Sequence, residues 1–188
     1  MLQIKSVPLT IVMTLCFNPL SAAAYDSDIL NTYSKLSPRF ILMSTQKSKI
    51  DERINICLSH EPEDEAAAQE LIDLTRANYP KGIKEYEIHF VKTRYGDARA
   101  CSESQLHFLF NTNRESLKNA LLFSQTQKIM TISYDGKHLE DGVDISLFIG
   151  RKIVPHLNIK SIEKKGIQLD NLLLRISKIY NINTKADK

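Results

Sequence analysis

The sequence predicts an α/β fold with a mixed sheet of about six strands, covered by helices and ending in a β-hairpin and a helix. In the first half, segments with strand-like alternation take turns with segments of helical spacing. Farther on, a Gly150–Arg151 turn separates two apolar runs, as is typical of a hairpin. No repeat or linker divides the 188 residues, so we expect one domain.

Residues 1–24 have the pattern of a cleaved signal peptide. Lys5 is the only charged residue there, an apolar run covers 7–17, and small residues occupy 21–24. The run is shorter than the ~20 residues needed to cross a bilayer, although an uncleaved anchor is the alternative. We therefore expect export to the periplasm and a domain of residues 25–188, with its core at 54–180 and a cut after Ala23 or Ala24.

The first helix of the domain is predicted to begin at Ser27, which can act as its N-cap. Apolar residues at helical spacing follow it: Ile29, Leu30, Tyr33 and Leu36. Pro38 is expected to kink or end this helix. Leu36, Phe40 and Ile41 are candidates for a partner or dimer surface, although packing in the core would explain them equally well.

The middle of the chain alternates between predicted strands and helices. The strands are expected at 53–58, 86–90, 106–110 and 129–132, and the helices at about 61–78 and after Asn113. The second helix is expected to bury Leu117, Ala120, Leu121 and Leu122. Polar loops are expected at 93–104 and 134–142.

The end of the chain is predicted to form a hairpin and two helices. The hairpin strands are 143–149 and 152–159, and Pro155 should lie on an edge strand or at a bulge because it has no amide proton. A short helix is expected from Lys160 to Gly166. Asp170 is then expected to cap a last helix whose inward residues are Leu172, Leu173, Ile176 and either Ile179 or Tyr180.

Two cysteines remain when Cys16 leaves with the leader. An even pair in an oxidising compartment predicts a disulfide between Cys57 and Cys101, the alternative being two separate buried thiols. In the chain-entropy model, closing the loop between them stabilises the fold by ~4 kcal/mol.

Charge and motifs argue against several functional classes. The net charge is only +3 and no long basic block occurs, so nucleic acid and anionic lipid are not expected partners. The five histidines lack zinc-site spacing, although His89 and His107 lie in strands and could approach each other. No phosphate-binding loop or nucleophile motif is present. We therefore expect no enzyme activity, no metal and no cofactor.

Several segments occur together in an order typical of one family. They are Ile54–Leu58 with its cysteine, Leu106–Phe110, Lys128–Ser133, Asp141–Ile145, Gly150–Ile153, Leu157–Ile159, Gly166–Ile167 and Leu172–Leu173. With these segments, the chain from Ile54 to Tyr180 resembles the YfiR-like family of periplasmic proteins.

The resemblance implies a regulatory function. Proteins of that family restrain an inner-membrane diguanylate cyclase by binding its periplasmic part, and so limit cyclic di-GMP synthesis. They can also dimerise, and an intramolecular disulfide supports the inhibitory form. The resemblance therefore implies protein–protein interaction with an inner-membrane partner. The alternatives are a structural or assembly component of the cell envelope and, in third place, a small-ligand sensor or an enzyme.

Overall fold

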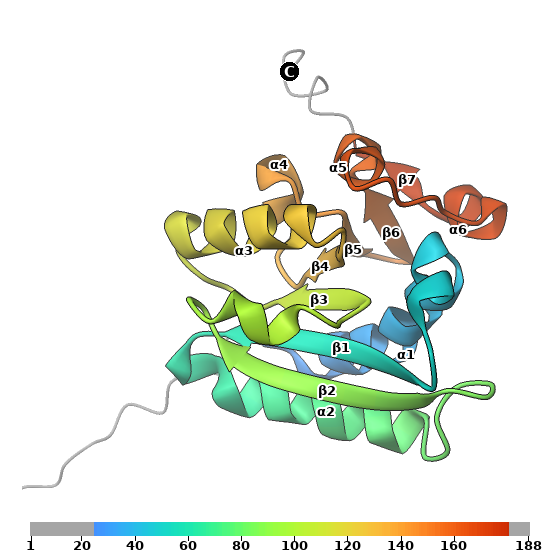
Figure 1. Cartoon of the computed structure of the whole chain (residues 1–188), viewed down its shortest axis with the longest axis horizontal. Helices are drawn as coiled ribbons and strands as arrows, with labels where there is room; N and C mark the ends of the chain where they lie inside the picture. The colour runs from blue at the N-terminus through green and yellow to red at the C-terminus, as the bar shows by residue number, and fades with distance from the viewer. Residues whose placement is uncertain (1–24, 181–188) are drawn as a thin grey trace, which may run out of the picture.

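Figure 1 shows the computed structural model, which describes residues 25–180. The predicted leader lies outside the described residues. Seven strands form one sheet: β1 (Arg53–His60), β2 (Glu87–Arg94), β3 (Leu106–Leu109), β4 (Met130–Ser133), β5 (Ile145–Ile149), β6 (Ile153–Leu157) and β7 (Lys178–Ile179). Their order in the sheet is β2-β1-β3-β4-β5-β6-β7. The predicted α/β class and mixed sheet are therefore confirmed.

The sheet is parallel from β2 to β5 and becomes mixed at the hairpin. β6 pairs antiparallel with β5, and β7 pairs in parallel with β6. Pro155 lies in β6, whose outer side is paired only at His156 and Leu157 among the described residues. The predicted edge strand is therefore not found, since β7 lies outside β6, but Pro155 occupies the part of β6 that β7 does not cover.

Helices cover both faces of this sheet (Figure 1). They are α1 (Ser27–Leu42), α2 (Glu65–Asn78), α3 (Arg114–Thr126), α4 (His138–Asp141), α5 (Ile159–Lys164) and α6 (Asn171–Ile176), together with the short 3-10 helices η1 (Thr45–Lys49), η2 (Pro62–Asp64) and η3 (Ala98–Cys101). None of the helices in residues 25–180 has the length and apolar character needed to cross a membrane.

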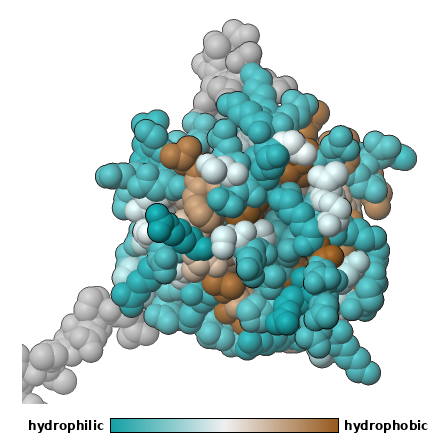
Figure 2. Space-filling model, viewed as in Figure 1, coloured by the Kyte–Doolittle hydropathy of each residue, from teal (hydrophilic) through white to brown (hydrophobic). Residues whose placement is uncertain are grey.

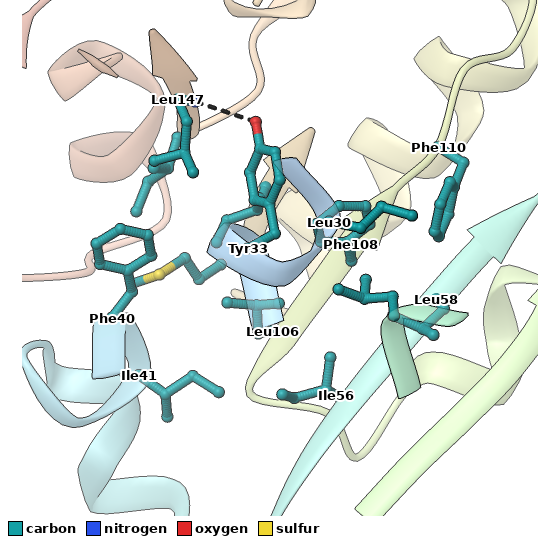
Figure 3. Packing of buried hydrophobic residues seen from close by; sticks show 14 of the residues in the cluster. Leu30, Tyr33, Phe40, Ile41, Ile56, Leu58, Leu106, Phe108, Phe110 and Leu147 are labelled. Carbon is teal, nitrogen blue, oxygen red and sulfur yellow. Dashed lines mark hydrogen bonds between the residues drawn. The ribbon is translucent and has the colours of Figure 1, made fainter. Parts of the chain in front are cut away.

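The main core lies between the sheet and the pair α1 and α2. Alternation along β3 sends Leu106 and Phe108 into this core, while His107 and Leu109 point to the opposite face beneath α3. At the centre, the hydroxyl of Tyr33 donates to the Ser133 carbonyl at 2.8 Å and accepts from the Leu147 amide at 3.1 Å. Figure 3 shows the Tyr33 ring directed at β5 among the buried apolar side chains. This contact fixes α1 to two neighbouring strands.

The first described residue belongs to the same core. Tyr25 is 7% exposed, and its ring contacts those of Phe110 and Tyr134 edge-on. Its hydroxyl donates to Asp64 at 2.7 Å and accepts from the Asn111 amide at 2.8 Å. Tyr25 is therefore packed as part of the domain.

Several local expectations were wrong. Asp26 rather than Ser27 caps α1. The helix does not end at Pro38 but continues to Leu42, which leaves a kink as the other predicted effect of this proline. The loops expected at 93–104 and 134–142 contain η3 and α4. Leu122 is exposed instead of buried, because only Leu117, Ala120 and Leu121 of that stripe face the sheet.

The last helix also differs from its prediction. It ends at Ile176, and a strand, β7, follows it. Only Leu173 is buried, whereas Leu172, Ile176 and Ile179 are exposed. A six-residue helix makes fewer than two turns, so it cannot bury a stripe as long as the predicted one.

Candidate functional site

Exposed apolar side chains occur on the elements at the β6–β7 end of the sheet. We define the C-terminal apolar surface as Phe148, Ile149, Ile153, Leu172, Leu174, Ile176 and Ile179. These side chains are between 38% and 58% exposed. They come from the β5–β6 hairpin, α6 and β7, which Figure 1 places together. In the same view, Figure 2 shows hydrophobic patches among the hydrophilic side chains.

Strand pairing arranges the hairpin part of this surface. Ile149 lies opposite Ile153, and Phe148 lies opposite Val154 on the other face of the hairpin. The Phe148 ring stacks on the His156 ring, with centroids 5.4 Å apart. Because the two faces carry apolar side chains, the surface continues around the hairpin. Contiguous apolar exposure on a folded domain is a feature of protein, membrane and ligand interaction sites.

Basic side chains interrupt the C-terminal apolar surface. Arg151 and Lys152 form the hairpin turn, Arg175 lies in α6 and Lys178 lies in β7, and all four are exposed. An apolar centre with a polar rim is typical of a protein interface. The positive sign of this rim favours a partner with acidic side chains around its own apolar contact.

The residues proposed from sequence as a partner surface lie elsewhere. Phe40 and Ile41 are 1% and 0% exposed and pack in the main core, as Figure 3 shows. Leu36 is half-buried against the same cluster. Core packing, the alternative explanation, therefore describes Phe40 and Ile41, and the structure corrects their assignment to a surface.

The sequence analysis did not predict the C-terminal apolar surface, although the sequence contains an indication of its hairpin part. Leu147, Phe148 and Ile149 are consecutive apolar residues beside a tight turn, and alternation places adjacent side chains on opposite faces of a strand. At the tip of a hairpin that extends beyond its neighbours, both faces reach solvent. The exposure of α6 had no comparable signal, since its residues have ordinary helical spacing.

A disulfide joins Cys57 of β1 to Cys101 at the end of η3. Both cysteines are completely buried. The chain crosses from β2 to β3 over β1, and the crossover contains η3 instead of a longer helix. The bridge thus fastens a short, polar crossover to the strand that it passes over.

His107 lies directly under this bridge. Its Nε2 atom is 2.6 Å from Ser59 Oγ and 3.7 Å from Cys101 Sγ, while its Nδ1 atom is 2.8 Å from Ser124 Oγ. Burial, with a smaller contribution from the positive charge of Lys165, lowers the pKa of His107 to about 3. His89, in contrast, is exposed on β2, and β1 separates it from β3. The two histidines therefore do not form a pair.

A second buried polar group joins α5 to the sheet. Lys165 Nζ lies 2.6 Å from Asp144 Oδ2, and both side chains are almost fully buried. The carboxylate of Asp144 also accepts from the Thr131 amide and from Ser161 Oγ, each at 2.7 Å. Burial lowers the pKa of Lys165, and the contact with Asp144 opposes that change. Because its hydrogen bonds are satisfied within the protein, we assign this ion pair a structural role, holding α5 against the sheet.

An acidic hollow lies where the strand order reverses between β1 and β3. It is lined by Glu61, Glu63, Asp64, Asn111, Thr112 and Asn113. Small ligands of α/β proteins often bind at such a switch point. Here Asp64 already bonds to Tyr25, and Thr112 Oγ1 donates to Glu61. The hollow is thus partly closed by internal hydrogen bonds, and the C-terminal apolar surface is the stronger candidate.

Comparisons with known proteins identify both family and fold. A family model described as YfiR/HmsC-like matches residues 38–178. No curated protein matches the chain.

Among solved structures, a conserved domain protein of Vibrio cholerae aligns with a TM-score of 0.58 at 11% identity, over 81% of this chain and 60% of its own. An ABC domain of Streptococcus pneumoniae, solved in complex with L-Trp, aligns with a TM-score of 0.55 at 9% identity, over 80% of this chain and 60% of its own. This chain thus spans less than two thirds of either structure, and at these identities the likeness concerns the fold alone.

Proposed function

The chain belongs to the YfiR/HmsC-like family, and from this premise we propose that it is a periplasmic regulatory protein that binds the periplasmic part of an inner-membrane signalling protein. A diguanylate cyclase is the partner that the family suggests. In this proposal the protein acts by binding and not by catalysis. The observation that carries the proposal is the C-terminal apolar surface.

Exposed apolar side chains supply affinity when a partner removes them from water. Burial of apolar surface contributes roughly 25 cal/mol per Å². Two strand residues, Ile149 and Ile153, lie opposite each other and can form the centre of such a contact. The basic side chains around them would orient an acidic-rimmed partner and make the association rate depend on salt.

A binding protein restrains its partner only by preferring one of the partner's states. To hold a cyclase inactive, the C-terminal apolar surface must fit the inactive arrangement of the periplasmic domain better than the active one. No contact with the catalytic domain across the membrane is then needed.

Introducing a negative charge into the C-terminal apolar surface tests the proposal. Ile153→Glu and Leu172→Glu each place a carboxylate on an exposed apolar position, so folding should be little affected. The expected result is loss of co-purification with the periplasmic domain of the cyclase, together with a rise in cellular cyclic di-GMP.

Leu122→Glu is the matched control. Leu122 is 62% exposed but lies on α3, outside the surface, so this variant should bind and repress like the unchanged chain. Normal binding by Ile153→Glu and Leu172→Glu would overturn the assignment of the surface. Capture of envelope assembly components in place of a cyclase would favour the alternative, a structural component of the envelope.

A further inference from the structure

Three atoms of metal-binding type meet beneath η3. Cys57 Sγ, Cys101 Sγ and His107 Nε2 lie within 4.8 Å of one another, and all three residues are buried. Thiolate sulfur and imidazole nitrogen are the preferred ligands of zinc. We propose that reduction of the Cys57–Cys101 bridge converts these three side chains into a Zn²⁺ site.

The existing geometry is close to that of a zinc site. With Zn–S near 2.3 Å and Zn–N near 2.0–2.1 Å, tetrahedral angles separate a sulfur and a nitrogen ligand by about 3.6 Å. Cys101 Sγ and His107 Nε2 are 3.7 Å apart. The Cα atoms of the two cysteines are 5.4 Å apart, so the freed thiols can turn toward one ion without a large backbone movement.

The surroundings hold the imidazole in a ligating orientation. Ser124 Oγ bonds to Nδ1, which leaves Nε2 directed toward the two sulfurs. Such a hydrogen bond to the second ring nitrogen is typical of zinc-bound histidine. Ser59 Oγ, now bonded to Nε2, would be released, and its hydroxyl or a water molecule would supply the fourth ligand. Two thiolates also neutralise the charge of Zn²⁺, which a buried site requires.

The conversion is balanced when an external dithiol supplies the electrons. The dithiol passes two electrons and two protons to the bridge and becomes a disulfide, leaving Cys57 and Cys101 as thiols. Zn²⁺ then displaces both thiol protons. Access follows from the same step, because the bridge fastens η3 over the cluster and η3 residues Arg99 and Ala100 are exposed.

Cobalt titration tests the site directly. The purified chain is reduced with a phosphine, which becomes phosphine oxide by taking oxygen from water, and the phosphine is removed without oxygen. Co²⁺ is then added as a spectroscopic substitute for Zn²⁺. The expected result is a cobalt–thiolate absorption that saturates at one equivalent and disappears when Zn²⁺ is added. The oxidised chain should give no such absorption.

Histidine variants identify the third ligand. His107→Gln should weaken Co²⁺ binding by at least about tenfold, whereas His89→Gln, at an exposed histidine, should leave it unchanged. Absence of the absorption in the reduced chain, equal binding by the oxidised chain, or unchanged binding by a folded His107→Gln variant would each overturn the proposal. If circular dichroism shows His107→Gln to be unfolded, the reduced and oxidised forms of the unchanged chain still decide it.

Discussion

His107 is a buried base whose protonation opposes folding. Its pKa is about 3 in the folded protein, compared with about 6.5 in an unfolded chain. Between these values the unfolded chain binds a proton that the folded chain does not. The contribution of His107 to stability is therefore complete above pH 6.5 and is lost progressively as the pH falls toward 3.

This linkage gives a measurable pH dependence. From His107 alone, the free energy of unfolding should be about 2 kcal/mol lower at pH 5 than at pH 7.5. His107→Gln should be less stable at pH 7.5 but should lose about 2 kcal/mol less on acidification, as measured by urea unfolding at both pH values. His138 and His156, whose pKa values burial also lowers, remain in both proteins and cancel in the comparison. Equal losses in the two proteins would contradict the assignment.

At the scale of an element, the turn after α2 depends on a glycine. Gly82 has φ of +78°, and a Cβ atom there would lie 2.1 Å from the carbonyl oxygen of Tyr86. Gly96 also has positive φ, at +102°, but a Cβ atom there would meet nothing within 4 Å. The two positions share the conformational cost of a left-handed residue and differ only in crowding.

Alanine substitution separates these two costs. Gly82→Ala should destabilise the protein by about 1–3 kcal/mol more than Gly96→Ala, because the backbone at Tyr86 must move. Urea unfolding of both variants measures the difference. Equal destabilisation would show that the turn before β2 rearranges freely and that the close approach to Tyr86 has no energetic consequence.

Elements with a strong local pattern were predictable from the sequence. The Asn113 and Asp170 caps and the β5–β6 hairpin were correct, because each depends on a few neighbouring residues. β7 was not predicted, since two residues carry no alternation and pair with β6 only through the tertiary fold. The exposure of Leu172 and Ile176 was missed because spacing shows which residues share a helix face but not whether that face is covered.

In the candidate sites, too, some features follow from the sequence alone and others depend on the tertiary fold. The cysteine count alone indicated the Cys57–Cys101 bridge, whereas its contact with His107 required the order of the strands. Cys57 and His107 are opposite each other on neighbouring strands although they are far apart in the chain. Spacing rules for zinc sites use ligands close in sequence, so they could not find this cluster.

For the whole molecule, the bridge acts mainly on the unfolded chain. It links residues 44 positions apart, and loss of the closed loop should lower the free energy of unfolding by ~4 kcal/mol. Cys57→Ala/Cys101→Ala should therefore unfold at a lower urea concentration than the oxidised chain. The alanine variant loses the two sulfur atoms as well as the bridge. The reduced, unmodified chain loses only the bridge and therefore serves as the control. A difference of less than ~1 kcal/mol between oxidised and reduced chains would show that the crossover is held by other contacts.

If the chain is exported as proposed, the burial of Tyr25 has a consequence for the order of events that follow. If the leader is cut after Ala24, the scissile bond is joined directly to a residue whose ring is enclosed by Phe110 and Tyr134 and whose hydroxyl is bonded to Asp64. A peptidase needs the chain on both sides of that bond to be extended and accessible. The leader must then be cleaved before Tyr25 packs into the core. The yield of mature protein therefore depends on the rate of cleavage relative to the rate of folding. A precursor that folds first would protect its own cleavage site.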